Sequence, residues 1–140
     1  MKKIYKYDIG ISYAREQMDY VKKIEEALNK QGITCFIDYK EPERLWGEYL
    51  PEELRKIYTQ ECRAILVILS EEYTKKAYTK FESRIACERE ISGDTFLIIK
   101  TGDFSLPWLN STYGFLKSTQ YSTDEIAKFI KKKFSNPMKK

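Results

Sequence analysis

In the stretch from Ser70 to Glu82, one tyrosine is followed five residues later by a second tyrosine and four residues after that by a glutamate. The run "SEEYTKKAYTKFE" contains Tyr73, Tyr78 and Glu82, and it follows the apolar run "AILVIL". The chain has no histidine, which excludes histidine-dependent catalytic triads and the commonest protein ligand for metals. Acid–base chemistry or charge stabilisation then falls to carboxylates, tyrosine, lysine or cysteine. Glu82 is therefore a candidate catalytic carboxylate.

Glu82 also has a simpler interpretation, as one of the 21 acidic side chains of the chain on a solvated surface. Tyr78, Phe81 and Ile85 repeat at helical spacing and predict the buried stripe of a helix. On that helix Glu82 lies about 100° from Phe81 and one turn beyond Tyr78, at the margin of the stripe. A carboxylate in this place fits a cleft as well as a surface, so the residues alone leave both interpretations open.

The composition is that of a globular domain, because hydrophobic residues make up 42% of the chain and charged residues 33%. No apolar run approaches the roughly 20 residues that cross a bilayer. The first lysines precede no continuous apolar stretch, so we expect neither a membrane span nor a signal peptide. The widely spaced Cys35, Cys62 and Cys87 indicate reduced thiols in the cytoplasm rather than disulfides or a metal site.

Much of the net charge of +4 lies in the C-terminal run "KKKFSNPMKK", residues 131–140. We expect a single domain over residues 1–140, with a core of about residues 5–135 and this run as a basic tail. A basic tail could contact nucleic acid. Since no other feature of nucleic-acid binding accompanies it, we interpret the tail as a solvated helix end and expect no nucleic-acid partner.

Five short runs are typical of strands, namely residues 7–12, 33–37, 64–69, 95–99 and 114–119. The third and fourth runs are almost wholly apolar, as in strands that are buried on both faces of a parallel sheet. The strand runs predict a set of buried side chains, comprising Ile9, Ile11, Phe36, Ile65, Val67, Leu97 and Ile98.

Helical patterns alternate with these strands. The first, "MDYVKKIEEALNKQG", is expected to stop at Gly32, and the last is expected to begin after an N-cap at Ser122 or Thr123. This alternation predicts an α/β fold, flavodoxin-like, with three α/β/α layers and a five-stranded parallel sheet in the order 2-1-3-4-5. Ligands bind such sheets at the carboxyl ends of the strands, so "YARE" after the first strand and the Ser70 run after the third should meet at one mouth.

Three runs, in order, resemble a Toll/interleukin-1 receptor (TIR) domain. "YDIGISYA" resembles the first motif of the family, with Gly10 where phenylalanine is usual. "GITCFIDYKEPERLWGEYLPEEL" is similar to the second strand and the loop after it, which is somewhat longer here. "AILVILSEEYTKKAYTKFE" is similar to the third strand followed by Ser-x-x-Tyr, an aromatic residue and glutamate, with Tyr78 where tryptophan is usual. The resemblance covers about residues 5–135.

The resemblance implies an activity, because the glutamate at the position of Glu82 is catalytic in TIR domains that consume NAD⁺. It implies a bacterial-type NAD⁺ nucleosidase that releases nicotinamide and either ADP-ribose or a cyclic isomer. NAD⁺ would be the substrate, with no cofactor and no metal. The implied setting is cytoplasmic antiviral defence or signalling, with a downstream effector that senses a cyclic product. The alternative is a non-catalytic adaptor or scaffold that acts through TIR–TIR contacts.

The resemblance also implies a set of substrate-binding residues, namely Tyr13, Ala14, Arg15, Asp38, Ser70 and Tyr78. Arg15 would pair with a phosphate, Asp38 would bind a ribose hydroxyl, and Tyr78 would stack on a ring of the substrate. Each has a structural alternative: Arg15 as a surface residue, Asp38 as the cap of a turn, and Tyr78 as a core aromatic residue.

Leu45, Trp46 and Gly47 form the candidate assembly loop. Leu45 and Trp46 are large apolar residues in a connection that is otherwise rich in charge. An aromatic residue in a loop marks a contact surface unless its ring is tucked against the domain. By resemblance, this loop packs against other TIR domains and can complete the site of a neighbour, so we expect weak self-association of the isolated domain.

Overall fold

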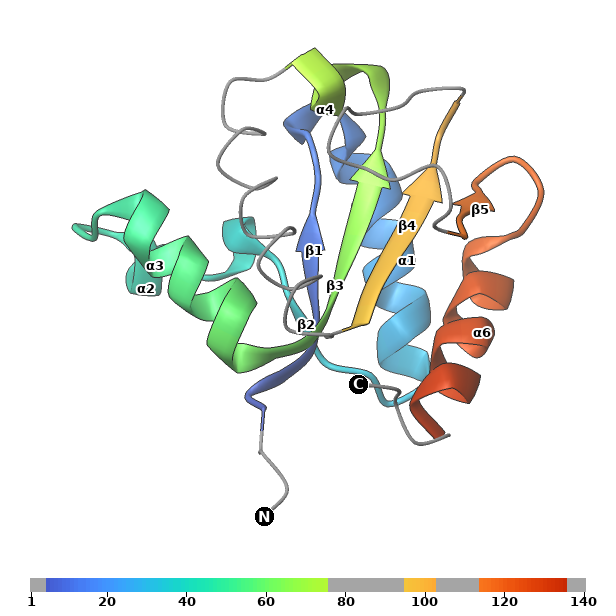
Figure 1. Cartoon of the computed structure of the whole chain (residues 1–140), viewed down its shortest axis with the longest axis horizontal. Helices are drawn as coiled ribbons and strands as arrows, with labels where there is room; N and C mark the ends of the chain where they lie inside the picture. Colours follow the sequence, from blue (N-terminus) through green and yellow to red (C-terminus); the bar gives the residue numbers. More distant parts are fainter. Residues whose placement is uncertain (1–4, 76–94, 103–113, 136–140) are drawn as a thin grey trace.

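The computed structural model describes residues 5–75, 95–102 and 114–135 (Figure 1). The predicted site residues Tyr78 and Glu82 lie outside these ranges. The described elements are, in chain order, β1 (Tyr7–Ser12), η1 (Arg15–Gln17), α1 (Met18–Lys30), β2 (Cys35–Phe36), η2 (Asp38–Lys40), α2 (Pro42–Leu45), α3 (Leu50–Lys56), the π-helical η3 (Ile57–Glu61), β3 (Cys62–Leu69), α4 (Glu71–Lys75), β4 (Thr95–Lys100), β5 (Leu116–Lys117) and α6 (Thr123–Ser135).

The five strands form one parallel sheet in the order β2-β1-β3-β4-β5, which confirms the predicted fold class and strand order. Strand β3 begins at Cys62, two residues before the predicted start, because it pairs with β1 from the Tyr7–Cys62 position onward. The edge strands β2 and β5 are only two residues long, shorter than the predicted runs. Short edge strands present few unpaired backbone groups to other chains.

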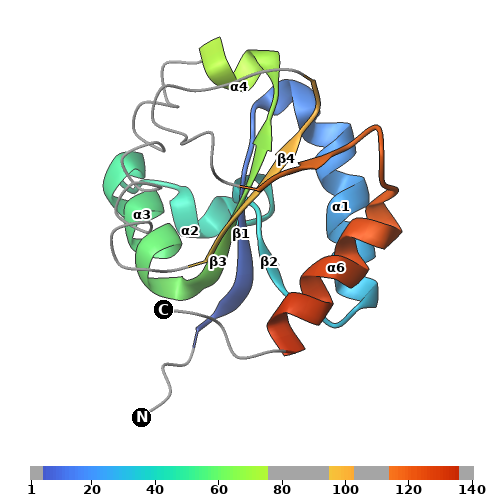
Figure 2. The ribbon, with the colours of Figure 1, turned by 45° about the vertical axis from the view of Figure 1, so that its right-hand side comes forward.

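Helices cover both faces of the sheet, as Figure 2 shows: α1 and α6 lie on one face, and α2 and α3 lie on the other. Side chains of β3 alternate between the two faces as the pleat of a strand requires. Ala64, Leu66 and Ile68 join the core cluster that includes α1 and α6. The second core cluster contains the intervening residues, Ile65, Val67 and Leu69. The layers are therefore those of the predicted α/β/α arrangement.

Six of the seven side chains predicted to be buried are buried, and Leu97 is half-buried. Leu97 lines a largely apolar hollow of about 420 Å³ between β4, β5 and α6, which leaves its side chain partly accessible. Among the described residues, no helix is both long enough and apolar enough to cross a bilayer.

Local signals in the sequence place the ends of α1 and α6. Gly32 has a φ of +77°, its N–H donates to the Asn29 carbonyl, and the Ile33 N–H donates to the Leu28 carbonyl. This is a Schellman motif, in which glycine takes the left-handed conformation at no steric cost. At α6, Ser122 and Glu125 form a reciprocal capping box, so Ser122 rather than Thr123 is the N-cap.

Gly10 makes room for the ring of Tyr58, which enters the core from the π-helical turn η3. A Cβ atom at residue 10 would lie 2.7 Å from Cys62 Sγ and 2.9 Å from Tyr58 Cδ1. The Tyr58 ring also packs edge-on against Phe36, with centroids 5.8 Å apart, and its hydroxyl donates to the Ile11 carbonyl at 3.2 Å. The side chain that the strand lacks at residue 10 is thus replaced by a ring from another element.

Candidate functional site

The segments that follow β1 and β3 meet at the carboxyl edge of the sheet, as predicted. Ser12 pairs with Val67 in the parallel register, so Tyr13 and Ala14 leave β1 beside the end of β3. Ser70 is the first residue after β3. The side chains of Tyr13, Ala14 and Ser70 are all at least nine-tenths buried. These predicted residues therefore lie together below the surface at the carboxyl edge of the sheet.

Tyr13 and Asp38 are joined by a hydrogen bond across the ends of β1 and β2. The Tyr13 hydroxyl donates to Asp38 Oδ1 at 2.7 Å and also lies 3.7 Å from Met18 Sδ. Asp38 is half-buried at the start of η2. Within the described residues, Oδ2 of Asp38 has no hydrogen-bond donor. One carboxylate oxygen is thus fixed by Tyr13, while the second is left to accept a hydrogen bond from a sugar hydroxyl or another donor.

Ser70 acts as a cap for α4 beneath the mouth. Its Oγ accepts a hydrogen bond from the Tyr73 N–H at 3.1 Å. The Tyr73 hydroxyl in turn lies 2.8 Å from Ser12 Oγ, and all three side chains are buried. The Ser-x-x-Tyr motif therefore fixes α4 to the end of β1. Sequence reasoning named Ser70 but missed Ser12, whose partner lies 61 residues away in the chain.

Arg15 is exposed at the start of η1, next to a polar bridge over the mouth. Gln17 Nε2 donates to Glu72 Oε1 at 3.2 Å, which joins the segment after β1 to the segment after β3. No hydrogen bond or ion pair within the described residues occupies the Arg15 guanidinium. It is available to an anion that approaches the mouth, in agreement with either predicted role, phosphate binding or a surface position.

Glu25 holds the turn η2 from the side of α1. It is 8% exposed, and its Oε2 lies 2.6 Å from Lys40 Nζ. The hydrogen bond that Lys40 donates to Glu25 raises the pKa of Lys40, so the ammonium stays charged at neutral pH. Since Lys40 and Asp38 belong to the same short turn, this ion pair and the Tyr13 bond position the turn together. The sequence offered no signal for it, because Glu25 and Lys40 come from separate elements.

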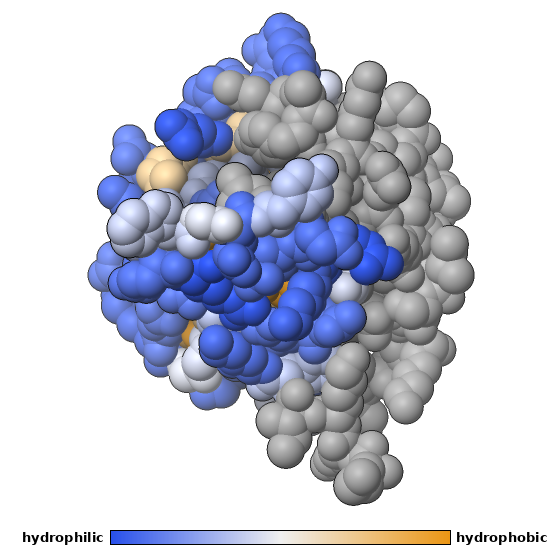
Figure 3. Space-filling view, turned by 90° about the vertical axis from the view of Figure 1, so that its left-hand side faces the viewer, coloured by the Kyte–Doolittle hydropathy of each residue, from blue (hydrophilic) through white to orange (hydrophobic). Residues whose placement is uncertain are grey.

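The residues of the candidate assembly loop face in different directions. Leu45 is half-buried against the second core cluster, whereas the Trp46 side chain is 87% exposed. Gly47 has a φ of +81°, a conformation that glycine adopts without strain. Figure 3 shows the face that carries α2 and α3, where the described surface is mainly hydrophilic. Trp46 therefore presents an aromatic ring within a polar surface.

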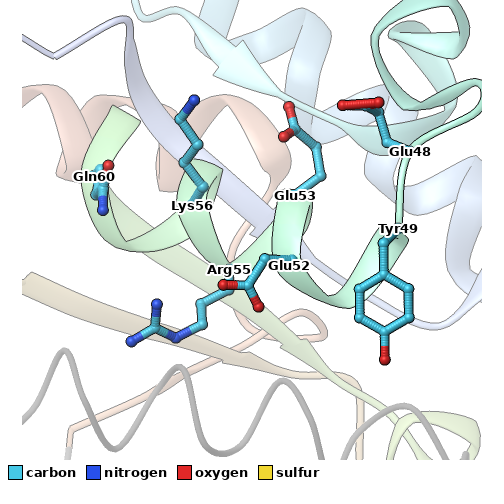
Figure 4. Close-up of a pocket in the computed structure, with 7 residues that line it drawn as sticks. All are labelled: Glu48, Tyr49, Glu52, Glu53, Arg55, Lys56 and Gln60. Carbon is cyan, nitrogen blue, oxygen red and sulfur yellow. The ribbon is translucent and has the colours of Figure 1, made fainter.

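A second hollow, of about 430 Å³, runs along α3 rather than at the mouth. Its lining residues are Glu48, Tyr49, Glu52, Glu53, Arg55, Lys56 and Gln60, shown in Figure 4. In that view Tyr49 and Arg55 extend to one side of the helix and Lys56 and Glu53 to the other. Carboxylates and cations are mixed along it, which does not favour one class of charged ligand.

Neither cysteines nor metal ligands add to the chemistry of the described residues. Burial and the carboxylates of Glu25 and Asp8 raise the pKa of the Cys35 thiol to about 12, so it stays protonated at neutral pH. Among the described residues, no group of three or more His, Cys, Asp and Glu side chains could hold a metal ion. The described part of the mouth offers the carboxylate of Asp38 and the guanidinium of Arg15 as polar groups, while the predicted carboxylate Glu82 lies outside the described residues.

Comparison with known proteins gives matches over most of the chain. The family model described as TIR domain matches residues 9–131. A 3′ cyclic ADP-D-ribose synthase from Aquimarina amphilecti is 30% identical over 131 residues, which are 92% of this chain and 40% of that protein. The chain thus spans well under half the length of this curated relative.

Solved structures share the fold at lower identity. A metazoan TIR-STING receptor from C. gigas has a TM-score of 0.70, with 18% identity, over 93% of this chain and 42% of that one. The TIR domains of the activated Roq1 resistosome give a TM-score of 0.58 and 23% identity over 67% of this chain and 57% of theirs. At these identities the likeness shows the fold alone.

Proposed function

Because the chain belongs to the TIR-domain family, we propose that it cleaves NAD⁺ at the bond between nicotinamide and ribose. The observation that carries the proposal is the 30% identity, over 92% of the chain, to a protein that makes a cyclic ADP-D-ribose. Loss of nicotinamide from NAD⁺ leaves the ADP-ribose group from which such a product forms. The products here are nicotinamide and either ADP-ribose or a cyclic isomer.

The chemistry suits a chain without histidine. The C1′–N bond breaks, and both of its electrons go to the ring nitrogen, so neutral nicotinamide leaves without a general acid. The ribose becomes an oxocarbenium-like cation, which a carboxylate stabilises or attacks. Water then adds at C1′ and releases a proton to give ADP-ribose, or a nucleophile of the same molecule adds to give a cyclic product. We assign the carboxylate role to Glu82.

The described part of the mouth supports the binding of such a substrate. We assign the carboxylate of Asp38, which Tyr13 fixes, to accept a hydrogen bond from a ribose hydroxyl, and the exposed Arg15 guanidinium to pair with the diphosphate. Tyr13 orients Asp38, and we assign Tyr78 to stacking against a ring of NAD⁺. NAD⁺ is the substrate in this scheme, which needs no cofactor. We place the activity in the cytoplasm, in antiviral defence or signalling, where an effector senses a cyclic product.

Substitution of Glu82 by glutamine tests this function. Without the charge that stabilises the ribose cation, we expect NAD⁺ cleavage to fall by about 10²–10³-fold while the fold is kept. Release of nicotinamide is followed at high protein concentration, with circular dichroism as the check of folding. Glu71→Gln is the matched control, since Glu71 is an exposed carboxylate of α4 paired with Lys75, and its activity should stay within about twofold of wild type. Near wild-type turnover by Glu82→Gln would reject the assignment.

A second function, that of a scaffold acting through TIR–TIR contacts, is favoured by the exposure of Trp46. A ring that is 87% exposed in a polar surface gains from burial against another protein. The two functions are compatible, and we propose that association of TIR domains through this loop promotes cleavage. A wild-type chain that associates through Trp46 but releases no nicotinamide would be a scaffold only.

A further inference from the structure

The loop that carries Trp46 keeps its backbone ordered while it exposes aromatic side chains. We call residues 41–49 the acidic loop, since they contain three glutamates and one arginine. Backbone hydrogen bonds run inside the loop, from the Trp46 N–H to the Pro42 carbonyl and from the Glu48 N–H to the Leu45 carbonyl. Trp46 and Tyr49 are nevertheless 87% and 75% exposed. The loop therefore has a defined shape without burying its own rings.

Arg44 joins the acidic loop to the helical segment that follows it. Its Nη1 donates to Glu61 Oε1 at 2.7 Å, its Nη2 donates to Glu61 Oε2 at 2.5 Å, and its Nε donates to Glu53 Oε2 at 2.9 Å. The three side chains are only 17–19% exposed. A planar guanidinium is the one cation that can make a paired contact of this kind with a carboxylate, and a lysine ammonium cannot reproduce it.

A second contact holds the start of the acidic loop. The Tyr7 hydroxyl of β1 donates to Glu41 Oε1 at 2.6 Å. Burial, with the neighbouring Glu41 carboxylate adding to it, raises the pKa of Tyr7 to about 12, so the phenol remains a donor at neutral pH. The loop is thus fastened to the sheet at Glu41 and to the helices at Arg44, two residues before Trp46.

Fastening of this kind lowers the cost of binding. A mobile loop loses conformational entropy when it docks, whereas a loop already held in its bound shape does not. We propose that Arg44 is a positioning residue for association: it holds Trp46 outward, so that a second copy of this chain meets a preformed surface. The inference rests on the association through Trp46 proposed above and names the residue that controls it.

Charge favours a second copy as the partner. The acidic loop is negative overall, since only one arginine offsets its glutamates and that arginine is already paired with Glu53 and Glu61. The whole chain carries a net charge of +4, so the remainder of another copy is positive. Much of that positive charge lies in the run of residues 131–140, so the acidic loop of one copy and the basic run of another attract each other, and this attraction weakens with added salt.

The test compares Arg44→Met and Arg44→Lys with the wild-type chain by sedimentation velocity over a concentration series, without NAD⁺. If the contacts of Arg44 with Glu53 and Glu61 hold the loop in its bound shape, both variants should need about tenfold more protein for half-maximal association. Met removes both the charge and the paired contact, and Lys keeps the charge but not the paired contact. Lys23→Met is the matched control, since it removes one positive charge from the exposed side of α1, on the face of the sheet opposite the acidic loop, and it should shift association less than about twofold.

A double-mutant cycle separates positioning from general destabilisation. In a Trp46→Ala background, Arg44→Met should cause no further shift in association, because the ring that Arg44 positions is gone. At saturating protein, the specific activity of Arg44→Met should stay within about twofold of wild type, since only the assembly step is impaired. If Arg44→Met does not fold, Arg44→Lys and Glu61→Gln decide the question.

Wild-type association by folded Arg44→Lys would overturn the inference, and so would an equal further shift caused by Arg44→Met in the Trp46→Ala background. The result is independent of catalysis. A chain that associates through Trp46 but cleaves no NAD⁺ would overturn the enzyme proposal and leave this inference standing. A chain that cleaves NAD⁺ and stays monomeric at every concentration would overturn this inference and leave the enzyme proposal standing.

Discussion

The two faces of the sheet are held by different kinds of contact. Under α1 and α6 the core is mainly aliphatic, with Ile24, Leu28 and Ile126 fully buried against the strands. The opposite face, under η3 and α4, is held by rings and hydroxyls. There the Tyr58 hydroxyl donates to a backbone carbonyl of β1 and the Tyr73 hydroxyl is bonded to a serine of the same strand.

The difference separates stability from positioning. Apolar burial is non-directional, so the aliphatic face stabilises the fold without dictating where a particular side chain points. Hydrogen bonds are directional, and those of the second face fix α4 and the acidic loop in place. The acidic loop and α4 are joined to this second face, whereas Asp38 and its turn η2 are held from the first face by Tyr13 and by Glu25 of α1. Substitutions on the two faces should accordingly differ in what they change.

The largest effect on stability should come from the aliphatic face. Ile24→Ala removes a fully buried side chain of α1 and leaves a cavity, so the free energy of unfolding should fall by about 2–5 kcal/mol. Urea denaturation measures the change, and Lys23→Ala on the exposed side of the same helix should change it by less than about 0.5 kcal/mol. Association per folded molecule should stay the same. If Ile24→Ala changed association strongly at unchanged stability, the difference drawn between the two faces of the sheet would be wrong.

On the second face, Gly10→Ala should cost about 1–3 kcal/mol, because the new methyl group would overlap Cys62 Sγ and the Tyr58 ring. Gly114→Ala is the control, since no atom of the described residues, chain neighbours aside, lies within 4 Å of a Cβ built there. Combining Gly10→Ala with Cys62→Ala should recover part of the loss, as the nearest obstacle is removed. Equal urea midpoints for Gly10→Ala and the wild type would show that Tyr58 can move away freely.

The pattern of apolar residues was sufficient to predict the strands and their order, because a parallel α/β sheet leaves few topologies once strands and helices alternate. The helix ends at Gly32 and at the Ser122 capping box were predictable for a different reason, since each is set by contacts among residues that are close together in the sequence. The lengths of the edge strands were not predictable, because they depend on pairing with one neighbour only.

The sequence predicted individual residues of the candidate site, but it did not predict the contacts between them. Tyr13 and Asp38 were each expected at the mouth, yet the bond between them depends on how the ends of β1 and β2 are placed. The sequence showed Gly10 where the family usually has phenylalanine, and only the three-dimensional structure shows Tyr58 in the vacated space. Arg44 gave no signal because its main partner, Glu61, lies 17 residues away. The role of Glu82 stays a prediction.

Trp46→Ala should have the smallest effect on stability, because a ring that is 87% exposed contributes little to the core. The change in the free energy of unfolding should stay within about 0.5 kcal/mol. If the ring is buried on association, NAD⁺ cleavage per molecule should rise with the concentration of the wild-type chain, and Trp46→Ala should flatten that rise. Tyr49→Ala, at the end of the same loop, should flatten it less if Trp46 is the central contact. Specific activity independent of wild-type concentration would show that association through the exposed ring does not promote cleavage.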